Sequence, residues 1–99
     1  MKKVYFDNAA TTQTDKDVAA TVLEYMTNTF GNPGSVHAFG REARKAVDIA
    51  REQVAKLIGA QPNEIFFTSG GTESDNISLK GVAYANRNRG KHIITSAIE

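Results

Sequence analysis

The pattern of apolar and polar positions divides the chain into helical and extended stretches. Apolar side chains recur three and four residues apart over about residues 15–28 and 38–58. This is the spacing of a helix that buries one face, so it predicts a helix in each stretch. The first is expected to begin at a cap formed by Thr14, and the second to end at Gly59, where a left-handed residue would close it. The second helix is expected to bury a stripe made of Ala43, Val47, Ala50, Val54, Leu57 and Ile58.

Three short apolar runs predict extended structure. Residues 4–6 indicate a small strand or arm, and residues 64–68 and 92–96 indicate strands of a sheet. A glycine-containing break at residues 69–71 separates the first of these strands from a third helix, expected over about residues 72–87. Strand, glycine loop, helix and strand in this order are typical of an α/β protein.

Composition and charge narrow the class of protein. A length of 99 residues suits one domain, and 40% hydrophobic and 23% charged residues are typical of a globular chain. Twelve basic and eleven acidic residues give a net charge of +1, which predicts no nucleic-acid or membrane partner because both need a basic surface. No apolar run approaches the roughly 20 residues that span a bilayer, and no signal peptide precedes the pattern, so a cytoplasmic location is expected.

The residues that commonly bind metals or attack substrates are scarce. The chain has no cysteine, which excludes disulfides, thiolate metal sites and a cysteine nucleophile within these residues. The two histidines, His37 and His92, are too far apart in sequence to predict a local metal site. No metal ion is therefore expected.

The glycine loop between the predicted strand and the third helix is the best candidate for chemistry. It reads Ser69, Gly70, Gly71 and Thr72. The first N–H groups of a helix have no partner within the helix and carry a partial positive charge, so a phosphate is well bound there. The glycines would let a phosphate approach the backbone, and the two hydroxyls would lie beside it. A tight connection without a ligand explains the same residues, and neither the dinucleotide fingerprint nor the P-loop matches.

Three segments carry a family resemblance. Residues 6–12 read FDNAATT, residues 31–37 read GNPGSVH, and residues 67–76 read FTSGGTESDN. In this order and at about this spacing they resemble the cysteine desulfurase branch of the class V aminotransferases, and the resemblance covers essentially the whole chain. It implies the N-terminal piece of the pyridoxal-phosphate-dependent transferase fold, an α/β fold. Residues 1–14 would form an arm, and residues 15–99 the incomplete start of the large cofactor-binding domain.

The resemblance also implies site residues. Gly71 and Thr72 match contacts to the phosphate of pyridoxal 5'-phosphate, Thr72 through both its hydroxyl and its N–H. Asn8, Ala9 and His37 match segments near the substrate pocket. Two simpler roles stay open: Asn8 could cap the turn after the arm, and His37 could hydrogen-bond the preceding loop. Acidic residues in the first turn of the third helix are attributed to the helix dipole and left out of the site.

No catalytic residue is predicted within the chain. The family's cofactor-binding lysine, its pyridine-binding aspartate, its ring-stacking histidine and its sulfur-accepting cysteine would all lie beyond Glu99, and Lys80 and Lys91 match none of them. The resemblance thus implies an N-terminal fragment that is inactive alone. Its parent would be a homodimer that takes sulfur from L-cysteine, leaving L-alanine and an enzyme persulfide. A sulfur-acceptor protein would then serve iron-sulfur cluster or thio-cofactor synthesis.

Three other functions fit part of the pattern. Another class V aminotransferase or a selenocysteine lyase would share the same motifs. A non-catalytic product could bind pyridoxal phosphate or pair with a full-length subunit. A generic phosphate- or nucleotide-binding protein explains the glycine loop but not the segments around Asn8 and His37. In each case the predicted strands lack sheet neighbours, so we expect another copy of the chain to cover them, as a homo-oligomer.

Overall fold

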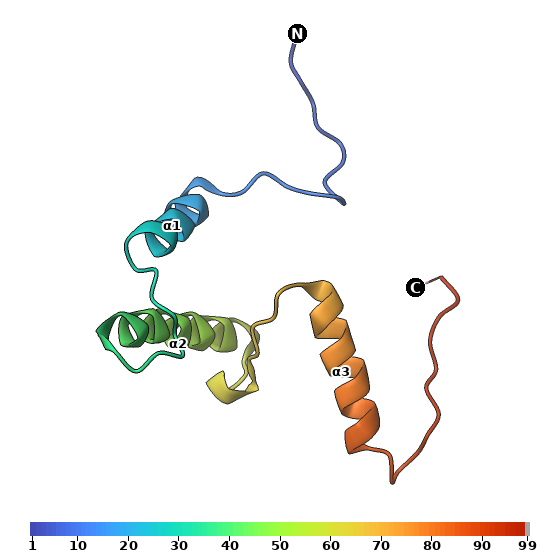
Figure 1. Ribbon diagram of the computed structural model, residues 1–99. Coiled ribbons are helices and arrows are strands. Elements are labelled where there is room, and N and C mark those ends of the chain that lie inside the picture. The colour runs from blue at the N-terminus through green and yellow to red at the C-terminus, as the bar shows by residue number, and fades with distance from the viewer. Residues whose placement is uncertain (99) are drawn as a thin grey trace. The chain divides into compact units, whose positions relative to one another are not determined.

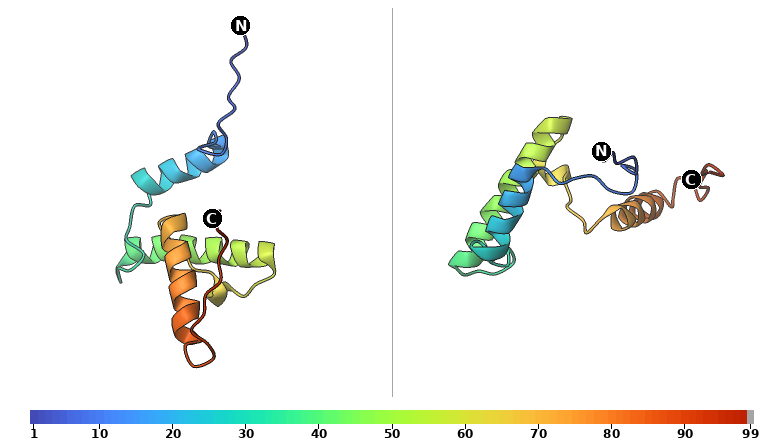
Figure 2. Two further views of the ribbon diagram at one scale, coloured as in Figure 1. Left: turned by 90° about the vertical axis from the view of Figure 1, so that its right-hand side faces the viewer. Right: turned by 90° about the horizontal axis from the view of Figure 1, so that it is seen from above.

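The computed structural model describes residues 1–98, which form three α-helices and one short 3-10 helix (Figure 1). Figure 2 shows the same elements in two further views, with helix as the regular structure of each unit. The chain divides into two compact units, Met1–Glu64 and the part from Ile65 onward, and each is described by itself. The elements are α1 (Lys16–Thr27), α2 (Ala38–Ile58), η1 (Pro62–Glu64) and α3 (Gly71–Ala85).

Helix α1 occupies the predicted stretch, but its cap is one residue later than predicted. The carboxylate of Asp15 accepts hydrogen bonds from the backbone N–H groups of Asp17 at 2.8 Å and Val18 at 3.4 Å. The prediction of Thr14 as the cap is therefore wrong. Both residue types cap helices, and the extended backbone of Asp15 brings its side chain to the open N–H groups.

Helix α2 has the predicted bounds and the predicted C-terminal cap. Gly59 adopts the left-handed conformation with φ 71°, and its N–H donates to the carbonyl of Ala55. Without a Cβ, glycine takes this conformation at little cost, and the helix ends there. The neighbouring 3-10 helix η1 packs against α2.

The predicted buried stripe of α2 is largely wrong. Of its six members only Ala43 is buried, while Leu57 is 85% exposed and Ile58 is 65% exposed. Among residues 1–98, Ala55 and Ile65 are the other buried apolar side chains. A stripe is buried only where another element covers it, and within unit Met1–Glu64 the element that packs on α2 is short.

The three predicted strands do not form in the part of the chain that the structure describes. Residues 4–6 and 92–96 are extended without strand pairing, and Glu64, the first residue of the other run, belongs to η1. A strand exists through hydrogen bonds to a neighbouring strand, and no two described segments pair in this way. Residues 1–98 therefore contain the helices of the predicted α/β fold but no part of its sheet.

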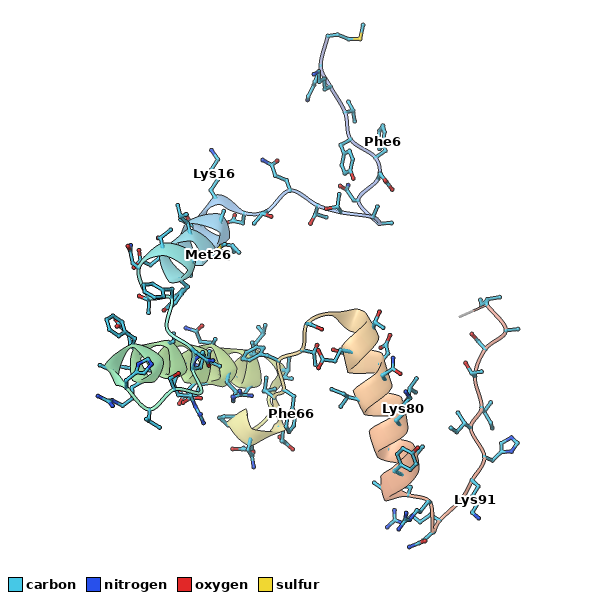
Figure 3. All side chains as sticks on the ribbon, viewed as in Figure 1. Phe6, Lys16, Met26, Phe66, Lys80 and Lys91 are labelled. Atoms are coloured by element: carbon cyan, nitrogen blue, oxygen red, sulfur yellow. The ribbon has the colours of Figure 1, made fainter. Side chains whose placement is uncertain are left out.

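Many large apolar side chains lie on the surface. Phe6 is 92% exposed and Met26 is 72% exposed; Phe6 lies on the N-terminal segment and Met26 on α1 (Figure 3). Within residues 1–98, none of the helices has the length and apolar character that crossing a membrane requires.

Candidate functional site

The glycine loop leads directly into α3, as the sequence predicts. Gly70 is the residue before the helix, with an extended backbone (φ 165°, ψ −178°) and no side-chain cap. The first helical hydrogen bond runs from the N–H of Ser74 to the carbonyl of Gly70 at 3.1 Å. The N–H groups of Gly71 and Thr72 have no acceptor among the residues that the structure describes. The loop therefore presents two unpaired backbone donors at the positive end of a 15-residue helix.

The space beside these donors is open. A Cβ added to Gly70 or Gly71 would meet no atom within 4 Å. The Thr72 hydroxyl also makes no hydrogen bond to a described residue. Two N–H donors and a hydroxyl donor at a helix start are the kind of groups that bind the oxygens of a phosphate.

Ser69 is bound to Glu73, which the sequence analysis left out of the site. Its backbone N–H and its hydroxyl both donate to Oε2 of Glu73, each at 2.7 Å. The backbone hydrogen bond first, and the hydroxyl second, hold the pKa of Glu73 below its usual value of 4.5. The expectation that the Ser69 hydroxyl faces a phosphate is therefore not met, because Glu73 takes it. Glu73 stands three residues after Gly70, where a capping box has its acid, but it accepts from Ser69 and not from Gly70, so the capping-box pattern does not predict this contact.

A second pair of hydroxyls ties the loop to the helix. Thr68 Oγ1 lies 2.6 Å from Ser74 Oγ and 3.2 Å from the carbonyl oxygen of Gly70. If the Thr68 hydroxyl donates to Gly70, the Ser74 hydroxyl donates to Thr68. The backbone on either side of Gly70 is thus held to the first turn of α3 by two side-chain contacts.

His37 caps helix α2. Its Nδ1 accepts a hydrogen bond from the N–H of Gly40 at 3.3 Å, which places the ring proton on Nε2. The simpler alternative from the sequence, a hydrogen bond to the preceding loop, is replaced by this bond to the following helix. The Nε2 edge makes no hydrogen bond to a described residue, so a role beside a substrate stays a prediction.

The loop before His37 is packed tightly against the start of α2. A Cβ on Gly40 would lie 2.2 Å from the carbonyl oxygen of Ser35, and one on Gly31 would lie 2.2 Å from the carbonyl oxygen of Phe39. Within the loop, Asn32 Oδ1 accepts from the N–H of Gly34 at 2.8 Å. These glycines permit a close backbone approach that no larger residue allows.

Asn8 and Ala9 lie in a turn after the N-terminal arm. The carbonyl of Asp7 accepts from the N–H of Ala10 at 3.1 Å and of Thr11 at 3.3 Å. The Asn8 side chain makes no hydrogen bond to a residue that the structure describes, so it does not cap this turn. Asn8 and Ala9 are exposed and adjacent, and their turn belongs to a different unit from Gly71 and Thr72.

Comparison with known proteins decides the family. The Aminotransferase class-V family matches residues 4–99. The chain belongs to the class V aminotransferases. This class V chain is 55% identical over 98 residues to "Cysteine desulfurase IscS" of Methanosarcina thermophila, covering 99% of this chain and 24% of that protein. It is 50% identical over 99 residues to "Putative cysteine desulfurase IscS 1" of Bacillus subtilis (strain 168), covering 100% of this chain and 26% of that protein.

A solved structure is also similar to this chain. The class V chain resembles a "NIFS-LIKE PROTEIN" with a TM-score of 0.82 and 46% identity, covering 89% of this chain and 24% of that one. The chain thus spans about a quarter of the length of the relatives it matches.

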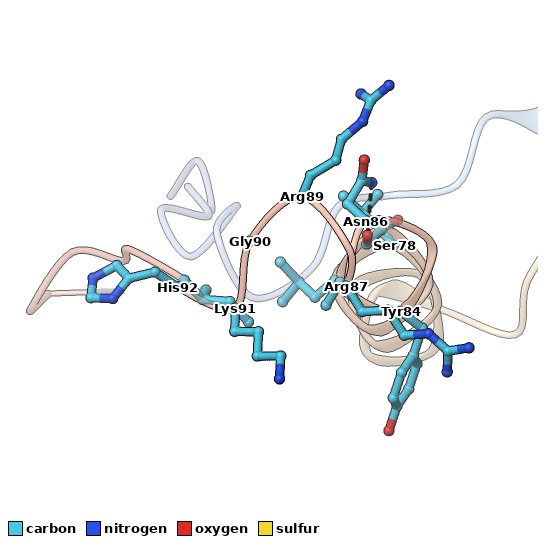
Figure 4. Close-up of a pocket in the computed structure, with 12 residues that line it drawn as sticks. Ser78, Tyr84, Asn86, Arg87, Arg89, Gly90, Lys91 and His92 are labelled. Atoms are coloured by element: carbon cyan, nitrogen blue, oxygen red, sulfur yellow. Dashed lines mark hydrogen bonds between the residues drawn. The ribbon is translucent and has the colours of Figure 1, made fainter.

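The class V chain also has a groove beside the C-terminal half of α3 (Figure 4). It has a volume of about 840 Å³ and combines apolar side chains such as Leu79, Val82 and Ile93 with the basic Arg87 and Lys91. None of the site residues predicted from the sequence lines it. Among residues 1–98 no three side chains of His, Cys, Asp or Glu type are grouped so that they could hold a metal ion.

Proposed function

We propose that this chain is the N-terminal part of a pyridoxal-phosphate-dependent cysteine desulfurase. The observation that carries the proposal is that relatives 50–55% identical over nearly the whole chain are named cysteine desulfurases. The whole enzyme would take sulfur from L-cysteine, release L-alanine and pass the sulfur as a persulfide to an acceptor protein for iron-sulfur cluster or thio-cofactor synthesis. It would work as a homodimer.

The role we assign to the glycine loop is to hold the cofactor by its phosphate. The unpaired N–H groups of Gly71 and Thr72 and the Thr72 hydroxyl support this assignment, since they are three donors at one helix start. When bound, pyridoxal phosphate supplies an electron sink for bonds at the substrate's α-carbon. The loop's own contribution is orientation: a phosphate fixed at the start of α3 fixes the position of the ring attached to it.

The remaining predicted residues are assigned to the substrate side. Asn8 and Ala9 would line the substrate pocket from the turn after an arm at residues 1–14. His37 would present its Nε2 edge, because its Nδ1 is held by the start of α2. Residues 15–99 would begin the large domain, whose sheet requires strands that the described residues do not contain.

Calorimetric titration of the chain tests the cofactor assignment. Pyridoxamine 5'-phosphate is the probe because it has the phosphate but no aldehyde that could react with surface lysines. Pyridoxamine, which lacks the phosphate, is the matched control, and adenosine monophosphate tests a generic phosphate site. We expect binding of the first probe alone. Equal binding of pyridoxamine would exclude the glycine loop as a site for the cofactor's phosphate. Equal or tighter binding of adenosine monophosphate would favour a generic phosphate-binding protein.

A second measurement tests the assignment of catalysis. The chain is incubated with pyridoxal phosphate and L-cysteine, and sulfide release is followed. We expect no sulfide above a cofactor-only control, because no residue of this chain is assigned to the chemical step. Turnover by the chain alone would show that a catalytic residue lies within it.

A further inference from the structure

The contact between Ser69 and Glu73 has a feature that a simple helix cap does not require. Both donors of Ser69, the backbone N–H and the side-chain hydroxyl, meet on the same carboxylate oxygen, each at 2.7 Å. One hydrogen bond would satisfy the open backbone group. The second occupies the hydroxyl of Ser69, the residue that precedes Gly70 and Gly71.

This contact divides the loop's donors into two sets. Both donors of Ser69 are bound to Glu73, while the N–H groups of Gly71 and Thr72 have no acceptor among the described residues. The hydroxyls of Thr68 and Ser74 lie 2.6 Å apart and also hold the loop to the helix, at the residue before Ser69. Both contacts hold the loop in the conformation in which the N–H groups of Gly71 and Thr72 are unpaired.

We propose that Glu73 is a positioning residue of the phosphate loop, which fixes Ser69 and so confines phosphate recognition to Gly71 and Thr72. The inference rests on the proposed function of the loop as a phosphate site. Glu73 itself touches no ligand in this account, since its carboxylate would repel a phosphate. Two hydrogen bonds from Ser69 fix that carboxylate, and its place in the first turn of α3 suits the helix dipole.

Four variants of the 99-residue chain test the positioning role. Glu73→Ala removes both hydrogen bonds, whereas Glu73→Gln keeps an acceptor for Ser69 and loses only the charge. Asp75→Ala is the matched control, because Asp75 is a carboxylate in the same helix whose side chain makes no hydrogen bond to a described residue. Ser69→Ala removes the hydroxyl but leaves the backbone N–H on Glu73.

The first readout is the affinity for pyridoxamine 5'-phosphate. We expect Glu73→Ala to bind about three- to tenfold more weakly, the effect of about one lost hydrogen bond. We expect an affinity within about twofold of that of the parent chain for Glu73→Gln, Ser69→Ala and Asp75→Ala. A change of this size is smaller than the effect of losing one hydrogen bond. Rescue by glutamine separates positioning from any effect of the charge. Unchanged binding by Glu73→Ala, or weakening by Ser69→Ala as large as that by Glu73→Ala, would overturn the inference.

The second readout is the amide hydrogen exchange of Ser69 in the absence of ligand. We expect faster exchange in Glu73→Ala and parent-like exchange in Asp75→Ala. If the parent chain does not prefer pyridoxamine 5'-phosphate to pyridoxamine, the proposed function fails and the binding role of Glu73 fails with it. If the parent chain does bind while Ser69 exchange and affinity are the same in Glu73→Ala, only the positioning role fails.

Discussion

Replacing Gly40 by alanine should destabilise α2, although alanine is the better helix former. In an exposed helix interior the change from glycine to alanine stabilises by about 0.8–1 kcal/mol. At Gly40 the added Cβ would lie 2.2 Å from the carbonyl oxygen of Ser35 and 2.8 Å from that of Asn32. Both partners are backbone atoms, so the loop must move.

The magnitude follows from what the movement disrupts. Forcing a methyl group into a packed contact costs about 1–3 kcal/mol. Displacing Gly40 also breaks its hydrogen bond to His37, and loss of a helix cap costs about 0.5–2 kcal/mol. After the gain in helix propensity, the net destabilisation is roughly 0.5–4 kcal/mol. Gly81 is the matched control: it lies within α3, and an added Cβ would meet nothing within 4 Å.

Residue-specific amide exchange is the appropriate assay, because the chain has two units that need not unfold together. Gly40→Ala should speed exchange throughout the first turns of α2, while Gly81→Ala should slow exchange in α3. Increased protection of α2 in Gly40→Ala would refute the close packing of the loop against the helix. Faster exchange of α3 in Gly81→Ala would contradict the assumption that a change from glycine to alanine stabilises an unobstructed helix position.

Three further predictions concern the helix starts. The folded-state pKa of Glu73 is lowered, so its contribution to stability should be complete above pH 4.5 and be lost as the pH falls through the folded-state pKa. The chemical shift of the Ser69 amide, followed in an acid titration, measures this loss. In the control variant Glu73→Gln the same shift should not change with pH. Asp15→Ala should weaken α1 by about 0.5–2 kcal/mol through its lost cap, measured by amide exchange; Thr14→Ala should have little effect, and the reverse ranking would contradict the cap assignment. His37→Ala should fray the start of α2 and His37→Asn should restore it, since asparagine also caps helices.

The helices could be predicted from the sequence because their signals are local. The spacing of apolar residues and the position of Gly59 fix α2 without reference to the rest of the chain. The strands could not be predicted correctly, because apolar runs such as residues 92–96 become strands only when a neighbour supplies hydrogen bonds. The buried stripe of α2 failed for the same reason, since burial of Leu57 and Ile58 depends on what covers them.

The position of the candidate site in the glycine loop could be predicted from the sequence, but the side-chain contacts within that loop could not. The position of Gly71 and Thr72 at a helix start follows from the sequence, and the structure bears this out. The pairing of Ser69 with Glu73 was missed because the helix dipole already explains an acid in the first turn, and no sequence pattern specifies a bond to Ser69. The close approach at Gly40 depends on a loop conformation that spacing does not specify.

Backbone amide chemical shifts of the chain, recorded during titration with pyridoxamine 5'-phosphate, test the central claim most directly. We expect saturable shifts centred on the amides of Gly71 and Thr72 with pyridoxamine 5'-phosphate and no such shifts with pyridoxamine. No response of these two amides, or an equal response to pyridoxamine, would contradict the assignment of this loop as the phosphate site.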